Sequence, residues 1–169
     1  RCMYLAKVDF RKRQHLFQDI ENLYFAGNLA DERFMLKGDR YLGEWSKVHL
    51  YENLTKYANL VLLSDGEAHP LVCLEAMSAG LGLVISEYSA ANLDTDLPFI
   101  DVVPEDKITD IEYVTNLLEK NRKVSVNMRN EIREYAKTFG WETIVSEVYF
   151  PTVRAASKYK TLAFNTQGV

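Results

Sequence analysis

The sequence is poor in the residues that build disulfide and metal sites. It has only two cysteines, Cys2 and Cys73, and both stand in apolar stretches without metal-ligand spacing, which favours reduced, buried thiols. Its three histidines, His15, His49 and His69, lie far apart in the chain. Zinc sites are built from closely spaced Cys and His ligands, so we predict no metal site and no bound cofactor.

Long apolar runs and long basic runs are also missing. No stretch approaches the roughly 18 apolar residues of a membrane-spanning helix, and no signal peptide opens the chain. We therefore expect a cytoplasmic protein without a transmembrane segment, or one held at a membrane surface as part of a longer protein. The chain has 24 acidic and 20 basic residues, and its longest basic run is residues 11–13. This balance argues against a nucleic-acid partner and favours small molecules.

The length and apolar content predict one domain. The chain has 169 residues, of which 47% are hydrophobic, enough for one core spanning residues 1–169. A strand pattern begins at Cys2 without an initiator methionine or a polar leader. We therefore expect a fragment of a longer protein that lacks an N-terminal domain.

Strand and helix patterns alternate along the chain and predict an α/β fold. Strand-like runs occupy residues 2–8, 23–26, 40–43, 60–63, 81–86 and 98–103. Helical patterns occupy residues 15–20, a segment capped by Ser46, residues 70–79, a segment opened by a capping box at 109–112, residues 126–138, and a segment from 142 that Pro151 kinks or interrupts. The segment after Ser46 has an apolar face at helical spacing, formed by Val48, Leu50, Tyr51, Leu54 and Tyr57. Residues 29–39 have no clear pattern. The alternation predicts a Rossmann-like, doubly wound parallel sheet, followed by helices at the C-terminal end of the chain.

The most informative stretch is residues 60–80, which predicts a buried strand, a polar turn and a short helix. Pro70 suits the first position of that helix and Gly80 suits its end. Glu67 lies in the turn, and Glu75 lies on the helix. Parallel sheets bind ligands beyond the carboxyl ends of their strands, so the turn at 64–69 is the predicted binding edge.

The spacing of these two glutamates resembles that of a known family. The run Ser64-x-x-Glu67-x-x-Pro70-Leu71-Val72-x-Leu74-Glu75-Ala76-Met77-x-x-Gly80 is similar to the donor-site signature of retaining, GT-B-fold glycosyltransferases of family 4. Three further segments resemble the family's Gly-Arg-Leu-x3-Lys, Phe-Leu-Gly and Phe-Ser-Trp-Glu stretches, namely Ala6-Lys7-Val8 with Lys12, Tyr41-Leu42-Gly43, and Phe139-Gly140-Trp141-Glu142. The chain thus resembles the C-terminal, nucleotide-sugar-binding half of a GT-B fold.

The resemblance implies a diphosphate site. Lys7 and Lys12 match the basic pair that neutralises the diphosphate and stabilises the departing nucleoside diphosphate, in place of a metal ion. The N–H groups of Leu71 and Val72, at the start of the helix, are expected to meet the phosphates because a helix N-terminus carries a partial positive charge.

The resemblance also implies sites for the two sugars of the donor. Glu75 would accept hydrogen bonds from the ribose hydroxyls, and Glu67 would hold hydroxyls of the transferred sugar. Leu42 and Gly43 would belong to the donor-binding pocket walls, on which the identity of the base and of the sugar depends.

Both glutamates have structural alternatives. Ser64 and Glu67 have the spacing of a capping box, in which Glu67 would only support a turn. Glu75 shares a helix face with apolar residues, and a buried carboxylate needs a partner. A lysine or arginine, such as Arg11 or Arg13, could serve as a purely structural partner.

The sequence also departs from the family pattern. Lys7 stands where the family commonly has arginine. A lysine ammonium makes a point contact to phosphate, whereas an arginine guanidinium makes a bidentate one. We expect Lys7, near the end of a strand, to have few routes to solvent. Ala68-His69-Pro70 replaces Gly-Phe-Gly and removes one N–H donor. His69 either compensates by donating from its ring or only caps the helix.

One acidic pair imitates a metal motif. Asp94-Thr95-Asp96 has the Asp-x-Asp form that holds a divalent metal in the other large class of glycosyltransferases. Its loop composition, without glycine-rich or basic surroundings, predicts a turn.

These observations predict an enzyme domain that binds a UDP- or GDP-sugar for retaining transfer of a hexosyl group. The acceptor, a saccharide, lipid or protein, would be held by the missing N-terminal domain, so the fragment alone would be inactive or weakly active. Two alternatives stay open: a non-catalytic sugar-nucleotide-binding subunit that acts with a partner chain, and an epimerase-like enzyme of the same fold.

Overall fold

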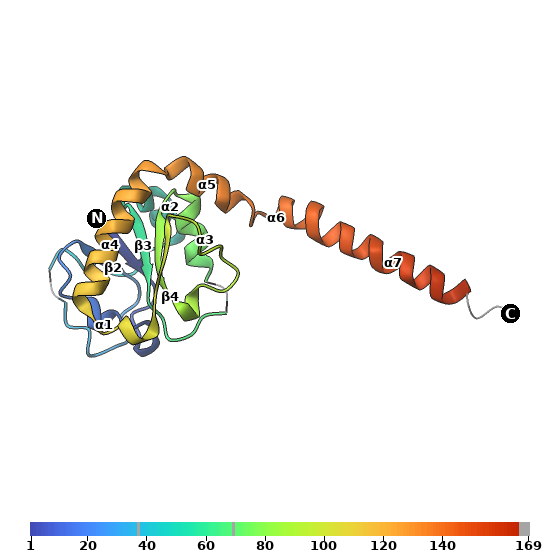
Figure 1. The fold of residues 1–169 in the computed structure, drawn as a ribbon. Coiled ribbons are helices and arrows are strands. Elements are labelled where there is room, and N and C mark those ends of the chain that lie inside the picture. The colour runs from blue at the N-terminus through green and yellow to red at the C-terminus, as the bar shows by residue number, and fades with distance from the viewer. Residues whose placement is uncertain (37, 69, 166–169) are drawn as a thin grey trace. The chain divides into compact units, whose positions relative to one another are not determined.

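The structure, a computed structural model, describes residues 1–36, 38–68 and 70–165, with side chains as far as Ser157. It contains two compact units (Figure 1). The first comprises Arg1–Arg133, and the second begins at Glu134. The first unit holds the whole sheet and has the α/β architecture that the sequence predicts.

Five parallel strands form the sheet, in the order β2-β1-β3-β4-β5. Their bounds are Cys2–Leu5 for β1, Leu23–Ala26 for β2, Asn59–Leu62 for β3, Gly82–Ser86 for β4 and Ile100–Val103 for β5. All residues of β1, β3 and β4 are buried, which explains why their sequences are mainly apolar and do not alternate. The predicted parallel α/β fold is confirmed.

Helices cover both faces of this sheet. Figure 1 shows α1 (Gln14–Phe17) and α4 (Ile111–Asn127) on one side, and α2 (Lys47–Asn53) and α3 (Leu71–Ser78) on the other. Short 3-10 turns follow the strands or extend the helices: η1 Phe10–Lys12, η2 Leu54–Lys56, η3 Glu87–Ser89 and η4 Glu105–Lys107.

The predicted cap of α2 is confirmed, but part of its predicted apolar face is not buried. The Ser46 side chain accepts a hydrogen bond from the backbone N–H of His49. Leu50 and Leu54 are buried, whereas Val48 and Tyr51 are 66% and 65% exposed. Helical spacing alone therefore overestimated how much of this helix faces the core.

One predicted strand is absent, and two other predicted elements have different ends. Residues 40–43 make no strand but a single bridge from Tyr41 to Phe25, after which Gly43 turns the chain with φ +72°. The predicted strand 2–8 ends at Leu5 and the predicted helix 15–20 covers only Gln14–Phe17. The chain turns between these two elements through η1.

The cap of α4 is also not the predicted one. Asp110, and not Thr109, accepts from the N–H of Tyr113, at 3.0 Å, so the helix begins one residue later than the capping box implies. The predicted helix at 126–138 is divided, because α4 runs to Asn127 and α5 begins only at Arg129 (Arg129–Lys137).

The second unit is helical. After Gly140 the chain forms α6 (Trp141–Thr143), the π-helical segment η5 (Ile144–Tyr149) and α7 (Phe150–Asn165) without a break. The helix predicted from residue 142 is confirmed, but it is not interrupted at Pro151, which lies within α7. Its hydrogen-bond pattern widens immediately before Pro151, where a proline ring would crowd the carbonyl of a regular α-helical turn.

Candidate functional site

The strand order defines a crevice between β1 and β3. From β1 the chain crosses to β2 on one side, and from β3 it crosses to β4 on the other. Two neighbouring parallel strands whose connections leave in opposite directions make a topological switch point, and open α/β sheets bind ligands at the carboxyl ends of the strands there. The loops in question are residues 6–13 and 63–70.

Hydrogen bonds join these two loops. The hydroxyl of Tyr4, a fully buried residue of β1, donates to the carbonyl of Lys12 and accepts from the N–H of Leu63 at 2.8 Å. The N–H of Asp65 donates to the carbonyl of Arg11 at 2.7 Å. Burial raises the pKa of Tyr4 well above its usual value, which keeps the hydroxyl protonated and able to donate.

Lys12 and Glu67, which are far apart in sequence, form an ion pair across the crevice. Their side chains are only 22% and 18% exposed. Burial lowers the pKa of the Lys12 ammonium, against the opposite effect of Asp9. The Ser64 hydroxyl also donates to Glu67 Oε1, at 3.1 Å. The capping-box alternative for Ser64 and Glu67 is wrong, because no helix begins there and the residue that caps α3 is Pro70.

Glu75 has a partner that the sequence did not indicate. Its carboxylate forms an ion pair with Lys47, at the start of α2. The alternative partner Arg13 binds Asp65 and Glu105 instead. Lys47 is 66% exposed and Glu75 22%, so this contact lies at the surface.

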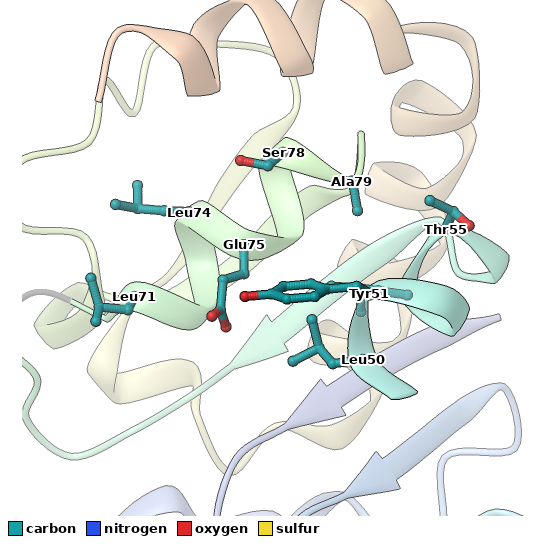
Figure 2. A pocket seen from close by; sticks show the side chains of 9 residues that line it. Leu50, Tyr51, Thr55, Leu71, Leu74, Glu75, Ser78 and Ala79 are labelled. Carbon is teal, nitrogen blue, oxygen red and sulfur yellow. The ribbon is translucent and has the colours of Figure 1, made fainter. Parts of the chain in front are cut away.

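The Glu75 side chain enters a groove of about 510 Å³ between α2 and α3. Figure 2 shows Glu75 and Tyr51 extending into it from the two helices, with Leu71 and Leu50 nearby. The walls are mainly apolar, formed by Leu50, Tyr51, Leu54, Thr55, Leu71, Leu74, Ser78 and Ala79. An acidic side chain in an apolar groove can hold hydroxyl groups while an aromatic ring contacts a flat ligand group.

The N-terminus of α3 follows the loop after β3, at the edge of the sheet where the strands have their carboxyl ends. Pro70 occupies the cap position and not the predicted first helical position. The carbonyl of Pro70 accepts from the N–H of Cys73, which is the first hydrogen bond of the helix. The N–H groups of Leu71 and Val72 come before it and have no acceptor within the helix. Leu71 is exposed and Val72 half-buried. His69 lies outside the described residues.

The other predicted residues lie beside β2. Lys7 is exposed, so the expectation that it has few routes to solvent is wrong: it follows the end of β1 and borders a hollow of about 310 Å³ that Glu44 and Trp45 also line. Leu42 and Gly43 bond through their backbones to Phe25 and Gly27, at 2.8 and 2.9 Å. The structure thus joins Lys12 with Glu67 but places Lys7, Leu42 and Gly43 nearer β2.

The acidic pair at 94–96 forms a turn, as predicted. Asp94 Oδ1 accepts from the N–H of Asp96 at 3.1 Å, which is the local hydrogen bond of an Asx turn. Among the residues that the structure describes, no three His, Cys, Asp or Glu side chains are grouped so that they could hold a metal ion. Within the same residues, no helix is long and apolar enough to cross a membrane.

The chain resembles several solved structures. No protein-family model and no curated protein matches it. The catalytic domain of cholesterol-α-glucosyltransferase from Helicobacter pylori is 19% identical, with a TM-score of 0.61 over 82% of this chain and 97% of that one. Sucrose-phosphate synthase from Thermosynechococcus elongatus is 20% identical, with a TM-score of 0.62 over 97% of this chain and 45% of that one.

A third similar structure contains a nucleotide. HepE from Anabaena, solved in complex with UDP, is 12% identical, with a TM-score of 0.67 over 91% of this chain and 48% of that one. The chain therefore spans about half the length of HepE and of sucrose-phosphate synthase. At these identities the likeness concerns the fold alone, a five-stranded parallel sheet with flanking helices that is consistent with the Rossmann-like half of GT-B glycosyltransferases.

Proposed function

We propose that this chain is the donor-binding domain of a retaining, metal-independent glycosyltransferase of the family 4 type. The observation that carries the proposal is the meeting of Lys12 and Glu67 at the β1–β3 switch point, since the sequence singled out both residues for one donor. Two of the structural neighbours support it by name: one is a glucosyltransferase, and HepE was solved with UDP and with UDP-glucose.

The diphosphate of the donor binds at the carboxyl ends of β1 and β3. Lys12 exchanges its ion pair with Glu67 for one with the phosphates, and Lys7 approaches from the β2 side on its flexible stem. The N–H groups of Leu71 and Val72 and the positive end of α3 add hydrogen bonds. Cations so placed stabilise the charge that develops on the leaving nucleoside diphosphate.

The two glutamates bind the two sugars of the donor. Once Lys12 turns to the phosphates, Glu67 accepts from hydroxyls of the hexose that is transferred. Glu75 exchanges Lys47 for the ribose hydroxyls. The base, uracil or guanine, lies toward Leu42 and Gly43. A saccharide, lipid or protein acceptor is held by a further domain, so this chain alone binds donor but transfers slowly or not at all.

Calorimetry with UDP, GDP and UDP-glucose tests the proposal. We expect micromolar to millimolar binding of at least one of them, and a loss of roughly tenfold to a hundredfold in affinity for Glu75→Ala, because a charged hydrogen bond contributes about 1.5–3 kcal/mol. Lys47→Ala is the matched control: it removes the same ion pair but leaves the carboxylate free, so affinity should be retained or improved.

The control separates a ligand contact from a structural one. If Glu75 served only to pair with Lys47, both variants would behave alike. Equal affinities of the two variants would contradict the assignment of Glu75, and absence of binding to all three nucleotides by the unaltered chain would contradict the proposed function.

A further inference from the structure

Arg13 has a backbone conformation that is unusual for its residue type. Its φ and ψ are 58° and 16°, in the left-handed region, where it links η1 to α1. For a residue other than glycine this conformation costs roughly 1–2 kcal/mol. Strain of this kind persists only where surrounding contacts enforce it, and such residues gather at functional sites. The contacts of Arg13 therefore need an explanation.

The guanidinium of Arg13 connects three loops at the carboxyl edge of the sheet. Its Nη2 lies 3.3 Å from Asp65 Oδ1 and 2.6 Å from Glu105 Oε1. Arg13 follows β1, Asp65 follows β3, and Glu105 begins η4 after β5. The arginine side chain is only 15% exposed, whereas Asp65 is 52% and Glu105 35% exposed, so water screens the pair with Asp65 more than the pair with Glu105.

Two of these loops carry the proposed ligand residues. Lys12 directly precedes Arg13, and Asp65 stands two residues before Glu67. The hydrogen bond from the Asp65 N–H to the Arg11 carbonyl joins the same loops through their backbones. The ion pair of Arg13 with Asp65 therefore lies next to that of Lys12 with Glu67, on the same two loops.

We propose that Arg13 is a positioning residue that holds Lys12 and Glu67 at the separation a diphosphate sugar requires, through its ion pairs with Asp65 and Glu105. This inference rests on the proposed function and adds a residue that does not touch the ligand. The planar guanidinium presents several donors in a fixed arrangement and can serve two carboxylates at once, whereas a lysine ammonium is a single point charge.

The test compares a nucleoside diphosphate with its monophosphate, since Lys12 is assigned to the diphosphate. Affinities for UDP and UMP, or for GDP and GMP where these bind more tightly, are measured by calorimetry on the whole chain. Arg13→Gly is the main variant because glycine adopts the left-handed conformation without strain. We expect the preference for diphosphate over monophosphate to fall about tenfold, with the monophosphate affinity unchanged within about twofold.

A second variant distinguishes positioning from direct contact and does not alter the backbone at Arg13. Glu105→Gln weakens the ion pair that holds Arg13 but leaves the guanidinium in place. We expect the preference for diphosphate over monophosphate to fall about threefold. If Arg13 itself bound the phosphates, this variant would free it and strengthen diphosphate binding. Lys120→Ala is the control, because it removes an ion pair with Asp101 of β5, outside the three loops.

Four outcomes would overturn the inference. The first two are an unchanged preference in Arg13→Gly and tighter diphosphate binding in Glu105→Gln. The third is an equal fall in the preference in the control Lys120→Ala. The fourth is a parallel loss of both affinities in Arg13→Gly together with a lower urea midpoint, which would mark a purely structural role. Absence of nucleotide binding by the unaltered chain would instead overturn the proposed function, and this inference with it.

Discussion

Lys12 and Lys47 each bind one of the two glutamates, but in different surroundings. Lys12 and Glu67 are both largely buried, whereas Lys47 is mostly exposed. Water screens an exposed pair and leaves it a net contribution of about 0–1 kcal/mol, so Lys47 gives up Glu75 to a ligand at small cost. The pair of Lys12 and Glu67 is less screened, and its exchange for a diphosphate is favourable because two phosphate charges replace one carboxylate.

We therefore expect Lys12→Ala to weaken UDP binding by roughly tenfold to a hundredfold, since it removes a charged contact worth about 1.5–3 kcal/mol. Lys56→Ala, at the end of η2, changes the net charge equally but lies outside the strand-end loops and should leave affinity unchanged. Calorimetry at one ionic strength gives both values. Equal affinities of the two variants would remove Lys12 from the site.

At the scale of single elements, the sequence was informative where burial is complete. The strands β3 and β4 were recognised because both of their faces are covered, so nearly every position is apolar; the polar exceptions are Asn59 and Ser86, at the strand ends. The end of α3 was recognised because Gly80 suits a left-handed cap, and its φ is +83°. Leu81 N–H donates to the carbonyl of Ala76 and Gly80 N–H to that of Met77, which together form a Schellman motif.

Other elements depend on contacts between distant segments. Thr109 and Asp110 can both cap a helix, and local sequence does not decide between them, because the start of α4 also depends on how Val114 and Leu118 are buried. The pairing of Glu75 with Lys47 follows from the way α2 lies beside α3. No spacing within either helix indicates it.

Gly80→Ala tests how strictly the end of α3 is defined. An added Cβ would adopt an unfavourable φ and lie 3.1 Å from the carbonyl oxygen of Arg129 and 3.0 Å from Arg133 Cζ. Gly43→Ala is the matched control, since its φ is +72° but no atom lies within 4 Å of the added Cβ. We expect Gly43→Ala to lower the free energy of unfolding by about 1 kcal/mol, the cost of the backbone alone.

Gly80→Ala should cost about 1 kcal/mol more than this control, because the close contacts add to the backbone strain. Urea unfolding with an unchanged slope measures both values. If the two variants were equally stable, the packing against Arg129 and Arg133 would not constrain the end of the helix that carries Glu75.

At the scale of the whole molecule, the order of the strands determines where a ligand can bind. The alternating pattern predicts a parallel sheet, but several strand orders share that pattern, and only the order β2-β1-β3-β4-β5 identifies β1 and β3 as the neighbours that flank the crevice. The family resemblance had already assigned residues of the loops after β1 and β3 to one donor site. The structure adds the physical reason, which is that both follow strands at the switch point.

All of the proposed ligand residues belong to the first unit. Lys7, Lys12, Glu67 and Glu75 lie within Arg1–Arg133, and the hydrogen bonds that join their loops come from the same unit. We therefore expect a chain that ends after Gly140, with α5 complete, to bind UDP with the affinity of the 169-residue chain, within about twofold. Calorimetry measures the affinity, and urea unfolding shows whether the shortened chain keeps its midpoint. A loss of binding at an unchanged midpoint would mean that residues after 140 contact the ligand, and the donor site would then extend beyond the sheet and its loops.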